Sequence, residues 1–491
     1  MVFNSYTFIV FFAIMLILHN LPFLSWKTKK INLLIASYLF YAAWNPPFIL
    51  LLWLSTIVDF FVGRALYTQE NKYRKRLLLV LSLIGNLGML CFFKYGNFFL
   101  ENFVALTNAI GLDFHPAKPN IILPAGISFY TFTTLCYTID MYKKKSEPVK
   151  YFLDFALFVT FFPHLVAGPI VRPPQLVPQF QHPHRATRLQ LLQGLFLLSL
   201  GLFLKVVVAD TLMAGSSNAV FASTKPLPAL DAWMGVLAFS GQIFSDFAGY
   251  STCAIGVAMC LGFILPENFR YPYAAIGFTD FWRRWHITLS SWLRDYLYIP
   301  LGGNRKSVFR TYFNLMMTML LGGLWHGASW TFVVWGALHG IYLCMEKWFK
   351  HIFGQGQKAI GKPVLQHASL QPAFTNSKGF QNILLALGTF FLINVTWVFF
   401  RARDFSTAWH LLVSMFGQSK MTTPLLTNID VIKVSVVITL IFICHWLMRN
   451  SSVLEVAKKV SWFALACFWA FLVISIIICQ KSGDSFIYFQ F

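Results

Sequence analysis

Long apolar stretches recur along nearly the whole chain, and they limit its possible folds more than any other feature. A helix that crosses a lipid bilayer needs about 20 consecutive, mostly apolar residues. Only 12% of the 491 residues are charged, whereas a soluble globular domain carries about 25%. The sequence therefore predicts an all-α polytopic membrane protein that forms a single membrane domain over residues 1–491. The stretches that approach the required length are residues 6–24, 31–66, 77–93, 121–140, 151–171, 189–209, 232–265, 311–345, 380–400, 431–448 and 460–479.

The second stretch contains the break Trp44-Asn45-Pro46-Pro47. Because the prolines lack amide donors and disfavour helix at the residue before them, we expect a hairpin of a short and a longer helix there. The first stretch has no basic segment before it and no cleavage pattern after it, so we expect a retained span. The longest polar insert, about 351–379, is expected to be a flexible loop.

Basic residues concentrate in short loops, for example at 27–30, 72–76 and 143–145. Because positively charged loops face the cytoplasm, this pattern predicts that both termini are extracytoplasmic. It also accounts for 39 Lys and Arg against 18 Asp and Glu without a nucleic acid as partner.

The cysteines and the common catalytic motifs give no sign of a metal or nucleotide site. The eight cysteines lie in or beside apolar stretches and form no CxxC pair, so we expect neither zinc nor a disulfide framework. No GxSxG elbow, phosphate loop or HExxH motif occurs in a supporting context.

Residues 278–295 are too charged to cross lipid unaided. On a continuous helix Arg283, His286, Ser290 and Arg294 would share one face. Such a segment either lines a cavity or lies at the interface. An amphipathic surface helix whose arginines meet anionic lipid headgroups is an equally good interpretation.

His326 lies in the middle of an apolar stretch, between glycines that let a backbone or a ligand approach closely. An ionisable residue at membrane depth is a functional candidate, and a neutral imidazole can act as general base on a hydroxyl. The alternative is a core histidine that hydrogen bonds to a neighbouring helix. His339 falls on another face if the helix is straight, so it ranks below His286.

Other ionisable groups in apolar stretches have simpler interpretations. His19, His164 and His445 are single histidines, which are more often satisfied core residues than catalytic ones. Asp246 is expected to form a structural ion pair.

Several segments together resemble the membrane-bound O-acyltransferase (MBOAT) family, in the bacterial branch that includes the alginate O-acetylation membrane subunit and the teichoic-acid D-alanylation protein. The most specific are residues 280–286 (Asp-Phe-Trp-Arg-Arg-Trp-His), 298–305 and 325–330, and the likeness extends to 123–132, 162–172 and 246–251. The resemblance implies about 11 to 13 transmembrane helices, each of about 20 residues. It also implies interfacial or re-entrant helices, a central tunnel, and a catalytic core segment at 278–345.

In that family two polar residues face each other where a cytoplasmic acyl thioester meets the acceptor, and by motif these are His286 and His326. The resemblance implies an acetyltransferase of the bacterial inner membrane that uses acetyl-CoA, without a tightly bound cofactor, to O-acetylate an extracytoplasmic polysaccharide such as alginate. The expected partners are an extracytoplasmic SGNH-hydrolase-like acetyltransferase, membrane lipid and other polysaccharide secretion proteins. Acyl transfer needs a base on the attacking hydroxyl and donors for the oxyanion.

The same resemblance suggests roles for four arginines and a tyrosine. Arg283, Arg284, Arg294 and Arg305 would form a basic rim for the phosphates of coenzyme A, although positive-inside topology explains these charges without a ligand. The tail 485–491 (Ser-Phe-Ile-Tyr-Phe-Gln-Phe) is similar to an aromatic C-terminal motif, so Tyr488 is expected to relay the acyl group. A tail that only packs as an aromatic plug is the alternative.

Other functions stay open. A transporter or flippase for a lipid-linked anionic sugar would use the basic face as an electrostatic guide, but it predicts paired half-repeats that the sequence lacks. A transferase that uses a carrier-protein thioester, D-alanine or peptidoglycan would share the same residues.

Overall fold

The structure is a computed structural model that describes residues 1–117, 119–353, 378–418 and 423–480. Within these ranges the chain is helical and contains no β-strand. Most of the expected 351–379 loop and the whole 485–491 tail with Tyr488 lie outside the described residues. The chain contains two compact units that share one long helix, α12 (Ala229–Cys260). The expected single domain over 1–491 stays a prediction.

Seven helical segments of the described chain are long and apolar enough to cross a membrane, which confirms the prediction of an all-α polytopic membrane protein. The larger number of about 11 to 13 crossings stays a prediction, since the other apolar stretches form shorter or more polar helices. The seven segments are Pro46–Thr68, Lys72–Ala109, Arg188–Ala222, Ala229–Cys260, Gly379–Arg401, Asn428–Met448 and Trp462–Cys479.

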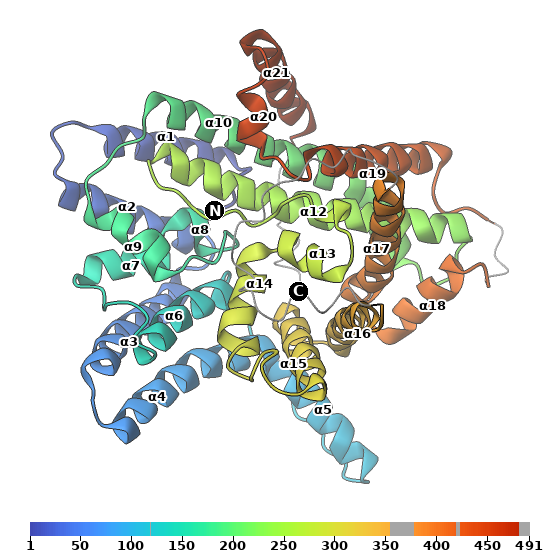
Figure 1. Ribbon diagram of the computed structural model, residues 1–491, viewed down its shortest axis with the longest axis horizontal. Coiled ribbons are helices and arrows are strands. Elements are labelled where there is room, and N and C mark those ends of the chain that lie inside the picture. The colour runs from blue at the N-terminus through green and yellow to red at the C-terminus, as the bar shows by residue number, and fades with distance from the viewer. Residues whose placement is uncertain (118, 354–377, 419–422, 481–491) are drawn as a thin grey trace. The chain divides into compact units, whose positions relative to one another are not determined.

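The first unit comprises residues 1–203 and 249–267. Its helices, shown from blue to green in Figure 1, are α1 (Tyr6–Asn20), α2 (Trp26–Ala42), η1 (Pro46–Phe48), α3 (Ile49–Thr68), α4 (Lys72–Leu90), η2 (Cys91–Tyr95), α5 (Gly96–Ala109), α6 (Ile127–Tyr142), α7 (Phe152–Thr160), α8 (Phe162–Leu165), α9 (Pro173–Gln181) and α10 (Arg188–Leu202), followed by the C-terminal part of α12.

Prolines decide where two of the apolar stretches break. The predicted hairpin is confirmed, because α2 ends at Ala42 and Pro46 and Pro47 begin a short turn that leads into α3. The stretch 151–171 is not one helix, since the chain turns extended at Phe161. Pro163 lacks the amide that would bond back to residue 159, so α7 cannot continue through it.

A buried polar network joins α3, α4 and α6, which lie side by side in Figure 1. The Asp59 carboxylate accepts hydrogen bonds from the Ser82 hydroxyl at 2.6 Å and the Asn86 amide at 2.7 Å. The Asn86 carbonyl in turn accepts from Ser55 and Thr134. Because polar groups in apolar surroundings are costly unless paired, this network fixes how the three helices pack.

The second unit comprises residues 204–248 and 268–480. Its elements are η3 (Phe203–Met213), α11 (Ala214–Ala222), the N-terminal part of α12, η4 (Pro272–Ala274), α13 (Phe278–Arg284), α14 (Ile287–Leu293), η5 (Arg294–Tyr298), α15 (Val308–His326), α16 (Trp330–Ile352), α17 (Lys378–Arg401), α18 (Phe405–Met415), α19 (Asn428–Met448), α20 (Val453–Ala457) and α21 (Trp462–Cys479).

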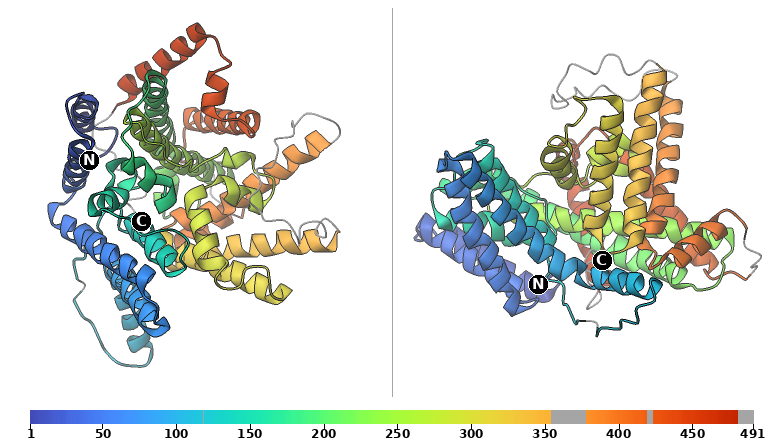
Figure 2. Two further views of the ribbon diagram at one scale, coloured as in Figure 1. Left: turned by 60° about the vertical axis from the view of Figure 1, so that its left-hand side comes forward. Right: turned by 90° about the horizontal axis from the view of Figure 1, so that it is seen from below.

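Glycines let α15 and α16 approach closely, and these two helices stand beside α17 in Figure 2. A Cβ atom on Gly323 would lie 2.3 Å from the Phe332 carbonyl, and one on Gly336 would lie 2.4 Å from the Met319 carbonyl. No side chain fits at either place, so glycine at both positions brings the two backbones together. This close pair holds His326 at the C-terminal end of α15.

Candidate functional site

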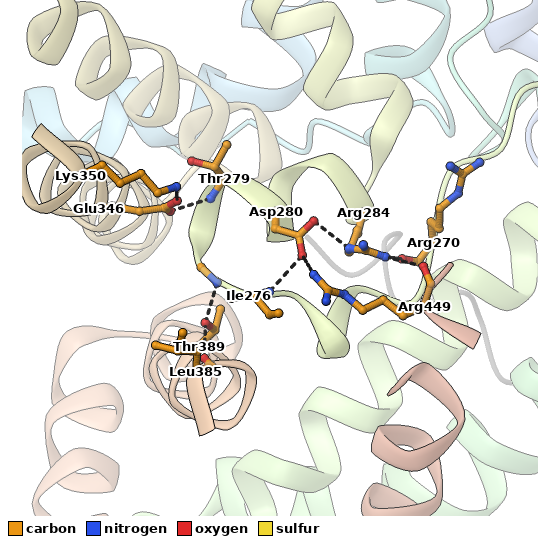
Figure 3. Close-up of polar contacts among 11 residues, drawn as sticks. Arg270, Ile276, Thr279, Asp280, Arg284, Glu346, Lys350, Leu385, Thr389 and Arg449 are labelled. Carbon is orange, nitrogen blue, oxygen red and sulfur yellow. Dashed lines mark hydrogen bonds and ion pairs between the residues drawn. The ribbon is translucent and has the colours of Figure 1, made fainter. Parts of the chain in front are cut away.

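The start of α13 is tied to two other helices by its backbone amides (Figure 3). The Gly277 amide donates to the Thr389 hydroxyl of α17 at 2.9 Å, and the Thr279 amide donates to the Glu346 carboxylate of α16 at 2.8 Å. Gly277 has φ +82°, and a Cβ there would meet the Glu346 carboxylate at 3.2 Å. The free amides at the start of a helix need acceptors, and here the acceptors fix α13 against α16 and α17.

Asp280 anchors the other side of α13 (Figure 3). Its carboxylate pairs with Arg284 at 2.9 Å and with Arg449 at 2.7 Å, and it accepts the Ile276 amide at 3.0 Å. Burial raises the pKa of Asp280, but Arg284, the Ile276 amide and Arg449 outweigh burial and lower it overall. Asp280 is therefore an ionised tether between α13 and the residue that follows α19.

The chain turns sharply between α13 and α14, at His286. His286 has φ +43° and ψ +56°, the left-handed region that non-glycine residues seldom adopt. Backbone hydrogen bonds from Arg270 to the Arg284 carbonyl and from Ile287 to the Asn268 carbonyl hold the turn against the segment 268–270. The expected continuous helix is thus wrong, and the predicted shared face of residues 283, 286, 290 and 294 does not exist. A strained residue held by its surroundings is a feature typical of functional sites.

Asn268 determines which nitrogen of His286 carries the proton. The side-chain oxygen of Asn268 accepts the backbone amide of Thr288 at 3.3 Å and its hydroxyl at 2.9 Å, and it lies 3.0 Å from His286 Nδ1. A backbone amide can only donate, so the Asn268 atom is the oxygen and Nδ1 is the donor toward it. In a neutral ring the lone pair is then on Nε2, which is the form that can accept a proton.

His286 is fully buried among aromatic rings. Burial lowers the pKa of His286 to about 3, so the ring is neutral at physiological pH. It meets the Phe247 ring edge-on at 4.7 Å and lies 6.0 Å from the Trp325 indole. A neutral, buried imidazole with a fixed tautomer can accept a hydrogen bond from a hydroxyl and orient it, whereas so low a pKa makes it a weak general base.

His326 ends α15, where Gly327 leaves the helix in an extended conformation. Its ring is 3% exposed and contacts Trp325 at 4.9 Å, Trp335 at 5.0 Å and Phe400 at 5.2 Å. The Trp325 indole therefore contacts both His326 and His286. The two histidines that the motifs single out lie at one aromatic cluster within the second unit.

His339 lies on a different helix from His326, because α15 ends at His326 and α16 begins at Trp330. The expectation that a single straight helix carries both residues is therefore wrong. The Thr396 hydroxyl lies 3.1 Å from His339 Nε2 and donates to the Ile393 carbonyl at 2.7 Å. Nε2 is then the donor toward Thr396, so His339 joins α16 to α17.

The remaining ionisable groups divide into satisfied and unsatisfied ones. The predicted ion pair of Asp246 is confirmed, with Lys205 at 2.5 Å, and Lys205 also pairs with Asp210 at 2.9 Å. His445 Nδ1 accepts the Tyr273 amide at 3.2 Å, as expected for a core histidine. His164 packs against the Phe161 ring. His19 differs, because neither of its ring nitrogens makes a hydrogen bond to a described residue.

The four arginines of the expected basic rim differ in what they contact. Arg283 and Arg305 are exposed. Arg284 is held by Asp280, and Arg294 pairs with the adjacent Asp295 at 2.7 Å. Across the described ranges, no group of three or more His, Cys, Asp or Glu could hold a metal ion.

Sequence reasoning missed Asn268. It lies 18 residues before His286, at the polar edge of an apolar stretch, and no helical or strand periodicity connects two such positions. The signal that could have drawn attention to it is the charged segment Glu267-Asn268-Phe269-Arg270, which follows the apolar stretch directly.

Comparisons with known proteins place these residues in a family. The model of the membrane-bound O-acyltransferase family matches residues 5–357, which include Asn268, His286 and His326. A probable alginate O-acetylase from Pseudomonas aeruginosa is 40% identical over 419 residues, covering 85% of this chain and 75% of that protein. A peptidoglycan O-acetyltransferase from Helicobacter pylori is 37% identical over 511 residues, covering 94% and 91%. A teichoic acid D-alanyltransferase from Bacillus subtilis is 30% identical over 259 residues, covering 48% and 63%.

Proposed function

We propose that this chain, which belongs to the membrane-bound O-acyltransferase family, moves an acetyl group from cytoplasmic acetyl-CoA across the membrane for O-acetylation of an extracytoplasmic polysaccharide. Its family makes it an O-acyltransferase, and its apolar helices make it a multi-pass membrane protein. The observation that carries the proposal is that His286 and His326 both contact the Trp325 indole.

His326 is proposed as the general base. An attacking hydroxyl loses its proton to the imidazole as its oxygen bonds to the acetyl carbon, and the carbon–sulfur bond of the thioester then breaks. The imidazolium returns the proton to the departing thiolate, so the ring is regenerated. His286 presents its Nε2 lone pair as a second acceptor that orients the hydroxyl. The surrounding aromatic rings exclude water, which would otherwise hydrolyse the thioester.

Arg283 and Arg305 are proposed to bind the phosphates of coenzyme A, because guanidinium groups recognise phosphate oxygens in pairs. Both are exposed, and the expected topology would turn them toward the cytoplasm. Arg284 and Arg294, which pair with carboxylates within the chain, support the site by holding α13 and η5.

Tyr488 is proposed as the first acceptor, followed by transfer to an extracytoplasmic SGNH-hydrolase-like acetyltransferase that modifies the polymer. This route requires the C-terminus on the extracytoplasmic side of a bacterial inner membrane, and the distribution of basic loops favours this side for both termini. The acceptor polymer is an exopolysaccharide such as alginate or the glycan of peptidoglycan. The peptidoglycan relative covers more of this chain, 94% against 85%, and this favours peptidoglycan as a second candidate.

Incubation of the purified full-length chain with [acetyl-14C]coenzyme A tests the proposal. We expect label on the protein that hydroxylamine removes, as from an ester, and loss of that label in Tyr488→Phe. Labelled Tyr488→Phe would exclude the relay. An unlabelled protein that moves a lipid-linked sugar between vesicle leaflets would instead support the transporter interpretation. A strain that lacks the protein identifies the acceptor polymer. The O-acetyl content of its peptidoglycan and of its exopolysaccharide is measured separately, and the polymer that loses acetyl groups is the acceptor.

A further inference from the structure

A cluster of cationic and imidazole groups in the first unit lies outside the residues assigned to acyl transfer. Four rings form its frame: Trp26 contacts His19 at 5.8 Å and His184 at 5.1 Å. Phe263 contacts the same two histidines at 6.0 and 4.8 Å. Each histidine therefore contacts both apolar rings, and these two rings also stack on each other at 6.4 Å.

The histidines have buried nitrogens that the fold does not use. Neither nitrogen of His19, which is 2% exposed, makes a hydrogen bond of normal geometry to a described residue, although the Leu261 backbone is near enough for a weaker one. His184 donates Nδ1–H to the His182 carbonyl at 2.9 Å, and its Nε2 is buried without a partner among the described residues. Buried polar atoms are normally hydrogen-bonded, so these nitrogens indicate a ligand.

Lys29 adds a charge that the fold also leaves without a partner. It is 3% exposed, and no described residue offers its ammonium group a hydrogen bond or an ion pair. Its neighbour Lys30 is the natural comparison, because Lys30 forms a buried ion pair with Asp154. Burial, together with the positive charge of Arg185, lowers the pKa of Lys29. An ammonium group beside apolar rings is more stable with a negative charge next to it.

The geometry around the cluster is fixed by the backbone. The Trp26 indole donates to the Phe180 carbonyl at 2.7 Å. Gly262 has φ +90°, and a Cβ atom there would lie 3.1 Å from both the Arg185 backbone and the His184 ring. Glycine at this position therefore lets the loop that carries the two residues pack closely. The cluster is thus held by α1, α2, the loop after α9 and the loop after α12. Positive-inside topology explains exposed charges such as Lys27, but it does not explain buried ones.

We propose that His19, Lys29 and His184 form a binding site for a phosphate group. Phosphate is an acceptor-only anion that can receive hydrogen bonds from an ammonium group and from imidazole N–H groups at once, whereas a metal cation would be repelled by Lys29 and Arg185. The aromatic walls suit a phosphate attached to an amphiphilic molecule. An anionic lipid headgroup and coenzyme A are the two sources of such a phosphate. The site is independent of the acyl-transfer proposal.

The test uses the full-length chain in nanodiscs of phosphatidylcholine, with thermal melting followed as ligand is added. The two probes are dioctanoyl phosphatidylglycerol and coenzyme A, with pantetheine as the phosphate-free control. We expect Lys29→Met and His19→Phe to raise the half-saturating concentration of one probe about tenfold or more, since hydrogen bonds to charged groups are lost. Lys27→Met, which removes an exposed charge on the same turn, is expected to leave it unchanged.

The probe whose half-saturating concentration rises in Lys29→Met and His19→Phe identifies the source of the phosphate. If neither probe stabilises the protein, or if Lys29→Met behaves like Lys27→Met, the proposal is wrong. A second measurement needs no ligand: Lys29→Met without any probe should melt no lower than the parent chain, because it removes a charge that no described residue pairs. Lys30→Met, which breaks an ion pair, should melt lower. An equal loss in both variants would mean that the fold itself pairs Lys29, and this too would overturn the proposal.

Discussion

Replacement of Asn268 tests whether the tautomer of His286 matters for acyl transfer. In Asn268→Leu a side chain of similar size accepts no hydrogen bond, so His286 Nδ1–H and two donors of Thr288 lose their acceptor. Each buried donor without a partner costs about 1–3 kcal/mol, and the one on His286 bears directly on the reaction. Since 1.36 kcal/mol corresponds to a factor of ten in rate, we expect kcat to fall about ten- to hundredfold while KM changes little.

Asn268→Asp separates this role from a merely structural one. The carboxylate keeps the acceptor for Nδ1–H, so the lone pair stays on Nε2 and transfer should persist. Its negative charge favours the protonated ring and raises the pKa of His286, so the acid limb of the rate profile should move to higher pH. Thr288→Val is the matched control, because it removes one hydrogen bond to Asn268 and leaves the one from His286.

The assay is acetyl transfer from labelled acetyl-CoA over a range of pH, on variants whose gel filtration and melting match the parent chain. Asn268→Leu with the parent kcat would refute the reasoning. So would a folded Asn268→Asp that is as inactive as Asn268→Leu and shows no shift of the acid limb, since Asn268 would then be needed only for packing.

Three further expectations concern stability, each measured by thermal melting in a fixed detergent. Arg284→Met should cost about 2 kcal/mol, less than a fully buried pair, because it removes one of the two arginines that pair with the partly exposed Asp280 carboxylate. Arg283→Met should leave melting unchanged, and equal losses would contradict this. Gly336→Ala should cost about 1–3 kcal/mol, because its Cβ would meet a backbone carbonyl at 2.4 Å, whereas Gly388→Ala meets nothing within 4 Å and should be neutral or stabilising. Burial lowers the pKa of His286 from 6.5 to about 3, so on acidification His286 is protonated in the unfolded chain before it is protonated in the folded one. The stability of the folded protein should therefore fall as pH drops from about 6.5 toward 3. Asn268→Asp, which raises the pKa of His286 in the folded state, should make this fall smaller.

Local chemistry allowed the sequence to predict the helix hairpin and the ion pair of Asp246. Pro46 and Pro47 act through their own missing amides, and a lone carboxylate in an apolar stretch has few options besides a cation. Such features depend on neighbours in the chain or on a single partner, and composition alone is enough to indicate a membrane protein.

Features that depend on distant backbone could not be predicted. The break at His286 is fixed by hydrogen bonds to the segment 268–270, and periodicity, which assumes a straight helix, placed Arg283 and His286 on one face. The placement of His326 and His339 on separate helices could not be predicted for the same reason, because the break between α15 and α16 depends on how the two helices pack. His326 and His286 were chosen by motif, and the contact of both with Trp325 was not visible in their spacing.

The most direct test of the central claim compares two buried histidines that differ in their contacts. His326→Ala removes the proposed base, and His339→Gln keeps a group that can donate to Thr396. With labelled acetyl-CoA, we expect acetyl transfer to fall about 10²- to 10⁴-fold in His326→Ala and to stay near the parent rate in His339→Gln. Acetyl transfer by a folded His326→Ala at the parent rate would contradict the account.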